Sequence, residues 1–437
     1  MVGESAISPI SVTAVTVSRG PSETAHDVLQ RHIVTIKGDR ARPTADTAGR
    51  DLSPALAVFC AHFAHRFLRV EPRRRMSAYI HGLVSGGERK NGWVQAESAG
   101  EAGPEGMQRL LNAATWDEDG VRDDVREVVV GAIGDIWQGR LIVGQTPFLK
   151  RGSRSAGVTT RISEETGRHA NAQIGVFLAY ASESGCGLID RELYLPQEWT
   201  DNRGRCRGAG VDDSVGYRSP SDLAQVMIGR ALDADVPFGW VTAGVCHGRS
   251  EQLRSWLEER GVPHVVEVPG ECRVATANLQ VRPASEVIDE LSESVWHRLS
   301  HLDDVAGLRV RDWAAVDLYK SGRQHGNWLL AGRSITDPSD VSYHLCFGPI
   351  GSILSELARI ADGRRAIDEC VRSARLESGL SDYQVRGYRP WYRHITLAMV
   401  ASAYQLILRG KNADRGEDGL SHIRPVRSRP NAVAPWW

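Results

Sequence analysis

The sequence predicts an α/β protein built on a mixed sheet that helices cover, and two observations lead to this fold class. Short runs rich in β-branched, aliphatic and aromatic residues begin at Arg140 and are separated by Gly, Ser and Asn, a composition typical of strands. From Pro220 onward, runs of this kind alternate with segments of helical periodicity. Three closely spaced strands followed by alternating helices and strands indicate a mixed sheet with helices packed on it.

The first three strands follow one another closely, so they are expected to form an antiparallel meander. The expected elements are strands at 141–143, 174–180 and 188–195, a helix at 220–233, a strand at 238–243, a helix at 250–260 and a strand at 264–268. Scattered tryptophans and short alternating segments between 270 and 349 predict a β-rich insertion. Helical periodicity returns at 353–375 and 392–409.

A helical unit is expected before the sheet. Leu56, Phe59, Cys60, Phe63 and Phe67 recur at steps of one, three and four residues, the spacing of one helix face. Arginines follow in a group, which suits either a phosphate backbone or a solvated face. The group consists of Arg66, Arg69, Arg73, Arg74 and Arg75.

Six segments result from this pattern. They are a poorly ordered leader (1–50), a helical nucleic-acid-binding domain (51–135), the first part of the core (136–269), the β-rich insertion (270–349), C-terminal helices that complete the core (350–410) and a tail (411–437).

Composition excludes little. A hydrophobic fraction of 41% and a net charge of −1 are ordinary for a soluble globular protein and do not indicate a nucleic-acid partner. Lysine supplies only five of the 53 basic residues. This arginine bias suits phosphate binding, but we favour GC-rich coding as its origin.

The cysteines and the apolar runs indicate where the protein works. Its seven cysteines are widely spread and lack the spacing of a zinc or redox pair, so we expect free thiols in a reducing bacterial cytoplasm. No apolar run approaches the ~18 residues that a membrane span needs. We therefore expect a cytoplasmic protein that does not use a membrane.

Four phrases carry a resemblance to a known family. The order of strands, insertion and late helix, together with these phrases, resembles the DDE transposases of bacterial insertion sequences, more narrowly the actinobacterial group numbered seven hundred and one. The resemblance implies a ribonuclease-H-like fold. The phrases are 148–158, 175–181, 188–196 with 199–201, and 391–398.

Such enzymes hold two divalent metals with two Asp and one Glu. By this resemblance, Gly144 takes the place of the first Asp and Gly244 that of the second. The third ligand belongs to a helical signature of Arg, three residues, Glu, six residues, Lys. Here that signature reads Arg364, Asp368 and Arg375, so one carboxylate survives in shortened form. We therefore expect no metal cofactor and no DDE nuclease chemistry.

Two functions remain open. The first is an inactive or vestigial transposase that still binds DNA. The second, taken by analogy with the enzymes of valanimycin-type biosynthesis, is an aminoacyl-tRNA-dependent transferase that moves a seryl-type group to a small amine or hydroxylamine in antibiotic biosynthesis. An aminoacyl ester is already activated, so this reaction needs positioning and perhaps one general base. We favour the transferase, with tRNA as the partner, and consider a homodimer possible.

Candidate catalytic residues lie beside the second substituted position. His247 suits a general base near neutral pH, and the alternative is that it replaces a loop aromatic. Cys246 would be a nucleophile with His247, although adjacent residues rarely face each other as such a pair requires. Asp368 would orient a base or bind one metal weakly, or it is a buried leftover paired with Arg364 or Arg375.

Candidate nucleic-acid contacts lie near the first substituted position and on the helices. Lys150 and Arg151 would bind phosphate or remain solvated. The complete set that we expect to contact nucleic acid consists of Lys150, Arg151, Arg364, Arg375, Arg73 and Arg74.

Overall fold

The structure is a computed structural model that describes residues 53–85, 96, 103–162, 167–303, 307–319 and 325–417. All of these belong to one compact unit, residues 44–437. The expected leader and the last residues of the expected tail lie outside the described residues.

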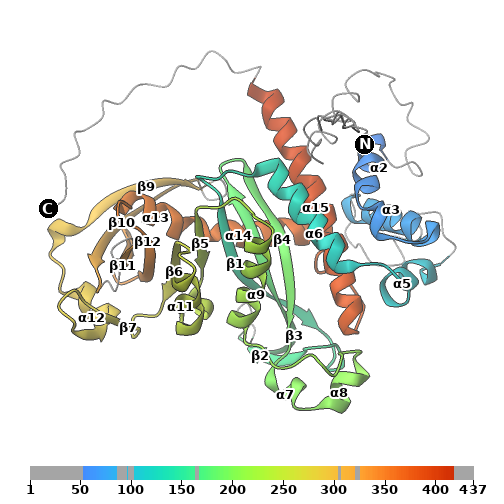
Figure 1. The fold of residues 1–437 in the computed structure, drawn as a ribbon, viewed down its shortest axis with the longest axis horizontal. Helices are drawn as coiled ribbons and strands as arrows, with labels where there is room; N and C mark the ends of the chain where they lie inside the picture. Colours follow the sequence, from blue (N-terminus) through green and yellow to red (C-terminus); the bar gives the residue numbers. More distant parts are fainter. Residues whose placement is uncertain are drawn as a thin grey trace, which may run out of the picture. The chain divides into compact units, whose positions relative to one another are not determined.

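The centre of the structure is a mixed sheet (Figure 1). Three strands form an antiparallel meander, and two further strands continue the sheet in parallel with the first. The strand order is β4-β3-β1-β5-β6, with the short β2 also paired to β3. The strands are β1 (Arg140–Lys150), β2 (Thr159–Ile162), β3 (His169–Ser182), β4 (Gly185–Tyr194), β5 (Trp240–Ala243) and β6 (His264–Val268).

The β-rich segment extends this same sheet. Strand β12 pairs antiparallel with β6, and β11, β10 and β9 follow it in order. The four strands are β9 (His297–Asp303), β10 (Gly307–Asp317), β11 (His325–Ser334) and β12 (Val341–Pro349). A separate hairpin and a short helix precede them, β7 (Arg273–Ala275), β8 (Val281–Pro283) and α12 (Ala284–Asp289).

Helices cover both faces of the sheet (Figure 1). One face carries α9 (Pro220–Asp233), whose first turn is closed by a capping box between Ser219 and Asp222. The opposite face carries α14 (Ala366–Ser378) and α15 (Tyr388–Glu417). Helix α14 ends at Gly379, whose φ of 61° is left-handed and therefore suits glycine.

The remaining helices lie before the sheet, between its strands or after β12. They are α2 (Pro54–His62), η1 (Ala64–Arg66), α3 (Val70–Val84), α5 (Glu105–Asn112), α6 (Glu118–Ile133), α7 (Gln197–Thr200), α8 (Arg203–Gly208), α10 (Val245–Gly248), α11 (Glu251–Glu259), η2 (Glu293–Val295), α13 (Leu354–Asp362) and η3 (Gly363–Arg365). No helix in the described ranges is long and apolar enough to cross a membrane.

The predicted fold class is confirmed, but two helix boundaries differ from the prediction. The helix expected at 353–375 is interrupted after Asp362, where Gly363 begins the short turn η3. The last helix starts four residues before the expected position and continues to Glu417, so the first residues of the expected tail are helical.

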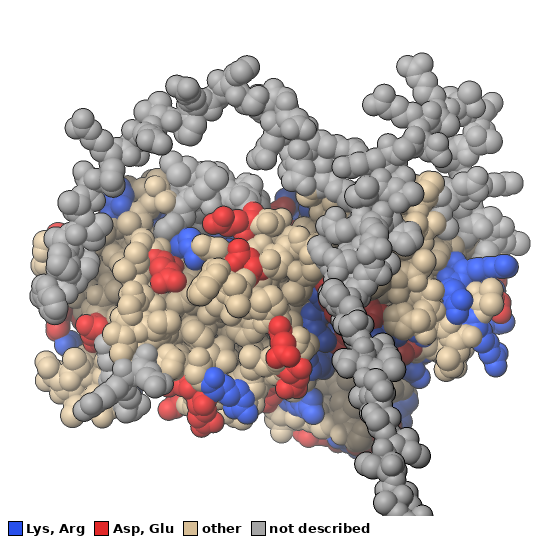
Figure 2. Space-filling model, turned by 45° about the horizontal axis from the view of Figure 1, so that its top comes forward, with Lys and Arg blue, Asp and Glu red and all other residues tan. Residues whose placement is uncertain are grey.

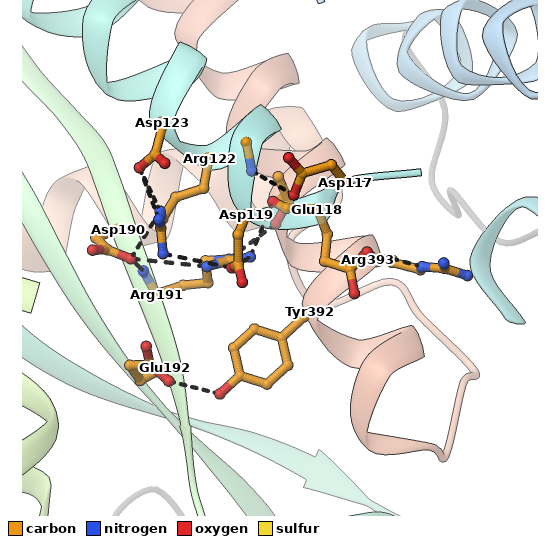
Figure 3. A network of polar contacts seen from close by, with 12 residues as sticks. Asp117, Glu118, Asp119, Arg122, Asp123, Asp190, Arg191, Glu192, Tyr392 and Arg393 are labelled. Carbon is orange, nitrogen blue, oxygen red and sulfur yellow. Dashed lines mark hydrogen bonds and ion pairs between the residues drawn. The ribbon is translucent and has the colours of Figure 1, made fainter. Parts of the chain in front are cut away.

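Ion pairs and hydrogen bonds join α6 and α15 to the edge strand β4 (Figure 3). Arg191 is fully buried and bonds to Asp119 at 2.9 Å and to the hydroxyl of Thr396 at 2.9 Å. On the same strand Asp190 accepts bonds from Arg230 of α9 at 2.8 and 3.0 Å. Since an unpaired charge is costly at such depth, these contacts hold the helices in one arrangement on the sheet.

Candidate functional site

Gly144 and Gly244 are brought together by the parallel pairing of β1 and β5. Val143 is in register with Ala243, so Gly144 lies within β1 at the level where β5 ends, and Gly244 follows β5 directly. Carboxyl ends of neighbouring parallel strands are a common place for binding sites in α/β proteins. The two glycines and the segment of η3 and α14 that faces them define the site described here.

Apolar side-chain atoms of Ile367 lie where a side chain at Gly144 would begin. A Cβ built on Gly144 would lie 2.9 Å from Cδ1 and 3.1 Å from Cγ2 of Ile367. Ordinary carbon contacts are about 3.5–4.0 Å, so no side chain fits at position 144 without a shift of this isoleucine. Ile367 is 1% exposed and belongs to α14. The helix therefore closes the first position with an apolar group.

The guanidinium of Arg364 lies against Gly244. A Cβ on Gly244 would meet Nη1 of Arg364 at 3.4 Å. Arg364 also pairs with Glu267 of β6 at 3.4 Å and with Asp368 at 3.7 Å. A fixed positive charge with two carboxylate partners thus stands beside the second position.

These residues do not fit a two-metal centre. Neither glycine offers a ligand atom, and the nearby carboxylates Glu267 and Asp368 share the cation Arg364. A guanidinium at this place repels Mg²⁺, whereas the metal requires a cluster of oxygen ligands. In the part of the chain that the structure describes, no group of three or more His, Cys, Asp or Glu side chains is arranged to hold a metal.

Asp368 is more exposed than a buried leftover would be. Its side chain is 64% accessible, and Arg364 is the partner four residues before it. The sequence suggested a buried carboxylate paired with Arg364 or Arg375. The structure shows the pairing with Arg364, but the Asp368 side chain is not buried. An exposed ion pair of this kind contributes little stability, so Asp368 is free to exchange Arg364 for another ligand.

His247 lies beneath the site and faces no polar partner. It is 2% exposed, and neither of its ring nitrogens has a hydrogen-bond partner among the described residues. Burial, together with the positive charge of Arg364, lowers the pKa of His247 to about 4. A neutral, enclosed imidazole favours the reading of His247 as a core residue over that of a general base.

Cys246 is exposed. Its sulfur accepts a hydrogen bond from the Gln145 side-chain nitrogen at 3.1 Å. No hydrogen bond joins Cys246 to His247, because both imidazole nitrogens lack partners. The described geometry thus contains no thiol–imidazole pair for nucleophilic catalysis.

Arg375 bridges α14 and β1 at the other end of the site. Its Nη2 donates to the Thr146 hydroxyl at 2.5 Å and to the Pro147 carbonyl at 2.6 Å. The guanidinium carbon also lies 5.6 Å from the centre of the Phe148 ring. These contacts fix the direction of Arg375, whose side chain is still partly exposed.

Lys150 lies farther along the same face of β1, over an aromatic ring. Its amine is 3.3 Å from the centre of the Tyr383 ring, a cation–π contact. Burial lowers the pKa of Lys150 to about 7. The amine is therefore shared between its charged and neutral forms at neutral pH, unlike a freely solvated lysine.

The other expected phosphate contacts are on the surface. Arg151, Arg73 and Arg74 are exposed. Arg73 donates to the Phe67 carbonyl at 3.1 Å. Figure 2 shows basic side chains gathered at the end of the view where α3 lies in Figure 1, while acidic and basic side chains mix over the rest of that face. The structure thus places Arg73 and Arg74 on a different element from Lys150 and Arg151.

The sequence comparison identifies the family to which this arrangement belongs. A family model described as DDE superfamily endonuclease matches residues 62–286, just over half of the 437 residues. The chain belongs to this family. The match includes β1 and β5 with Gly144 and Gly244, whereas α14 lies beyond it. The curated proteins contain no match to this chain.

Three residues of the site were missed from the sequence. Glu267 carried a signal, since it is the one charged residue of the strand His264–Val268. Ile367 and Tyr383 carried none, because only the packing of α14 and the following loop on β1 brings them to the site.

Proposed function

We propose that this chain is a nucleic-acid-binding member of the DDE family that does not cleave nucleic acid by two-metal chemistry. The observation that carries the proposal is the guanidinium of Arg364 beside Gly244, together with Ile367 against Gly144. Two-metal catalysis needs carboxylates at these places to hold the ions that activate water and stabilise the leaving oxygen. A cation and an aliphatic side chain provide neither.

Retention of nucleic acid is supported by the cations along β1 and α14. Arg375 is held against Thr146 while its side chain stays partly exposed, and Arg151 follows Lys150 at the end of β1. Arginine suits phosphate because its planar fork matches two phosphate oxygens. Lys150 contributes less positive charge than the others at neutral pH, since its pKa is about 7.

We further propose, as the finer function, transfer of an aminoacyl group from tRNA to a small amine or hydroxylamine. The observation that favours it is the amine of Lys150. A base with a pKa near the working pH removes a proton from an attacking nucleophile efficiently, and the pKa of Lys150 is lowered to about 7 by burial. In this proposal Lys150 takes the role of base that the sequence assigned to His247, and Arg375 and Arg151 hold phosphate.

The binding test compares two double variants. Lys150→Ala with Arg151→Ala should weaken tRNA binding and reduce the slope of log K against log salt by up to about two, since each lost phosphate contact removes ~0.9. The matched control is Arg282→Ala with Arg298→Ala, because these arginines are paired with Glu290 and Asp312. An unchanged salt slope in the first variant would remove both residues from the binding surface.

The reaction test distinguishes the two functions. The full chain is incubated with mixed aminoacyl-tRNAs and hydroxylamine-type acceptors, with and without EDTA, and the labelled aminoacyl group is followed. Selective discharge of one tRNA that EDTA does not prevent, with a new acylated product, supports the transferase. Retention of duplex DNA without any discharge of tRNA supports the transposase relic instead.

A further inference from the structure

Cys186 and Cys370 are brought together by the packing of α14 on the edge of the meander. Cys186 is the second residue of β4, and Cys370 is the fifth residue of α14. The two positions are 184 residues apart in the sequence, and the Cys370 thiol donates to the Cys186 carbonyl at 3.5 Å. This contact makes the two cysteines neighbours where α14 packs on β4.

The surroundings keep this pair reduced and protonated at rest. The pKa of Cys186 is well above its ordinary value because the Cys370 thiol hydrogen-bonds to it and burial disfavours the thiolate, while the charge of Arg140 acts in the opposite direction. Cys186 is partly exposed and Cys370 is 7% exposed. The thiol of Cys186 is itself enclosed, so an oxidant reaches the sulfur slowly and the minor thiolate form carries the reaction.

The remaining cysteines of the described residues differ from this pair. Cys60, Cys206 and Cys346 are buried, and the sulfur of Cys206 bonds to the Trp199 carbonyl rather than to a second thiol. Cys246 is exposed and accepts a hydrogen bond from the Gln145 side-chain amide. Cys272 is partly exposed and lies in the turn before β7.

We propose that Cys186 and Cys370 form a reversible disulfide when the protein meets a hydroperoxide. One thiolate attacks the peroxide oxygen, which gives a sulfenic acid and releases the alcohol or water. The second thiol then displaces the sulfenic oxygen as water and forms the S–S bond. Two thiols and one hydroperoxide give one disulfide, one alcohol or water molecule and one further water, so the two sulfurs supply the two electrons.

The bond would act on the helix that forms one wall of the site. Helix α14 carries Ile367, Asp368 and Arg375 besides Cys370. A covalent link to β4 restrains the movement of this helix along the sheet, and it removes chain entropy from the unfolded state because the closed loop is long. This inference is independent of the proposed function, since it concerns the sulfur chemistry alone.

The experiment counts thiols in the full chain before and after treatment with hydrogen peroxide, followed by unfolding and reaction with a thiol reagent. We expect seven thiols before treatment and two fewer afterwards. Peptide mapping without reductant should recover a cross-linked peptide pair that contains Cys186 and Cys370, two hydrogens lighter than the separate peptides. Reduction should restore both thiols.

Variants give the controls. Cys186→Ser should lose no pair of thiols, while Cys206→Ser should still lose two. The oxidised wild type should melt at a higher temperature than the reduced form, and oxidation should not raise the melting temperature of Cys186→Ser. The proposal is overturned if peroxide leaves all thiols intact, if the loss is spread over other cysteines such as Cys246, or if Cys370 is recovered as sulfinic acid. The peptide map of the wild type gives this answer even if a variant fails to fold.

Discussion

Substitution of Gly144 by aspartate tests whether the first ancestral position is closed by packing. A Cβ at this position would lie 2.9 Å from Cδ1 and 3.1 Å from Cγ2 of Ile367. Overpacking of this degree costs about 1–3 kcal/mol, so Gly144→Asp should lower the free energy of unfolding by that amount. The control is Gly216→Asp, because no atom lies within 4 Å of a Cβ at Gly216.

A double-mutant cycle shows whether Ile367 is the cause. Ile367→Ala alone should cost about 2–5 kcal/mol, because it leaves a cavity beneath a side chain that is 1% exposed. In the double variant the aspartate occupies part of that cavity, so the combined cost should be smaller than the sum by about 1 kcal/mol or more.

The assay is urea unfolding followed by far-ultraviolet circular dichroism. The wild type, both single variants, the double variant and the Gly216→Asp control are measured at one pH. Additive costs, within about 0.3–0.5 kcal/mol, would refute the packing argument. The same conclusion follows if Gly144→Asp is no more harmful than Gly216→Asp.

Three further predictions concern the core and the buried bases. Arg191→Met should cost about 1–3 kcal/mol, because it leaves the fully buried hydroxyl of Thr396 without its hydrogen-bond donor. The control Arg207→Met, at a side chain 63% exposed, should stay within about 0.5 kcal/mol in the same urea assay. Burial lowers the pKa of His264 from 6.5 to about 4. Between these pH values the unfolded chain binds a proton at His264 and the folded chain does not. The contribution of His264 to the free energy of unfolding should therefore be complete above pH 6.5 and fall as the pH drops towards 4. In that window His264→Phe should reduce the number of protons taken up on unfolding by about one, as read from the slope of the unfolding free energy against pH. An unchanged slope would show that His264 is not the titrating group. Competitive acetylation of Lys150 as a function of pH should show an inflection near 7, and an inflection near 10.5 would contradict its burial against Tyr383.

Periodicity predicted the local elements well, because each depends on residues close in the sequence. The strands at 174–180 and 264–268 and the helix at 220–233 all appear in the structure. Leu56, Phe59 and Phe63 are buried as expected, but the helix ends at His62, so Phe63 caps it and Phe67 follows η1 in an extended conformation. Such elements bury one face, and the burial leaves a direct trace in the order of apolar residues.

Long-range pairing left no such trace. Strand β12 continues the main sheet by pairing with β6, and these strands are separated by more than 70 residues. The composition of the insertion predicted strands but not the partner of its last strand, β12. The break between α13 and α14 was signalled by Gly363, a residue that weakens a helix interior.

The functional site was likewise predictable from the sequence only in part. Sequence alone pointed to Gly144, Gly244 and Arg364, and the structure brings all three to one edge of the sheet. The direction of Arg364 toward Gly244 and the position of Lys150 over Tyr383 depend on side-chain packing across distant segments. Neither follows from spacing.

The central claim is that nucleic acid is bound without two-metal cleavage. The most direct measurement follows binding and cleavage of end-labelled duplex DNA and of tRNA by the full chain, in Mg²⁺ and in EDTA, at one ionic strength. The account predicts retention of at least one of these ligands with the same Kd in both conditions and no shortened product. Cleavage that requires Mg²⁺ and disappears in EDTA would contradict it, because Arg364 and Ile367 would then leave room for the metal ions that the account excludes.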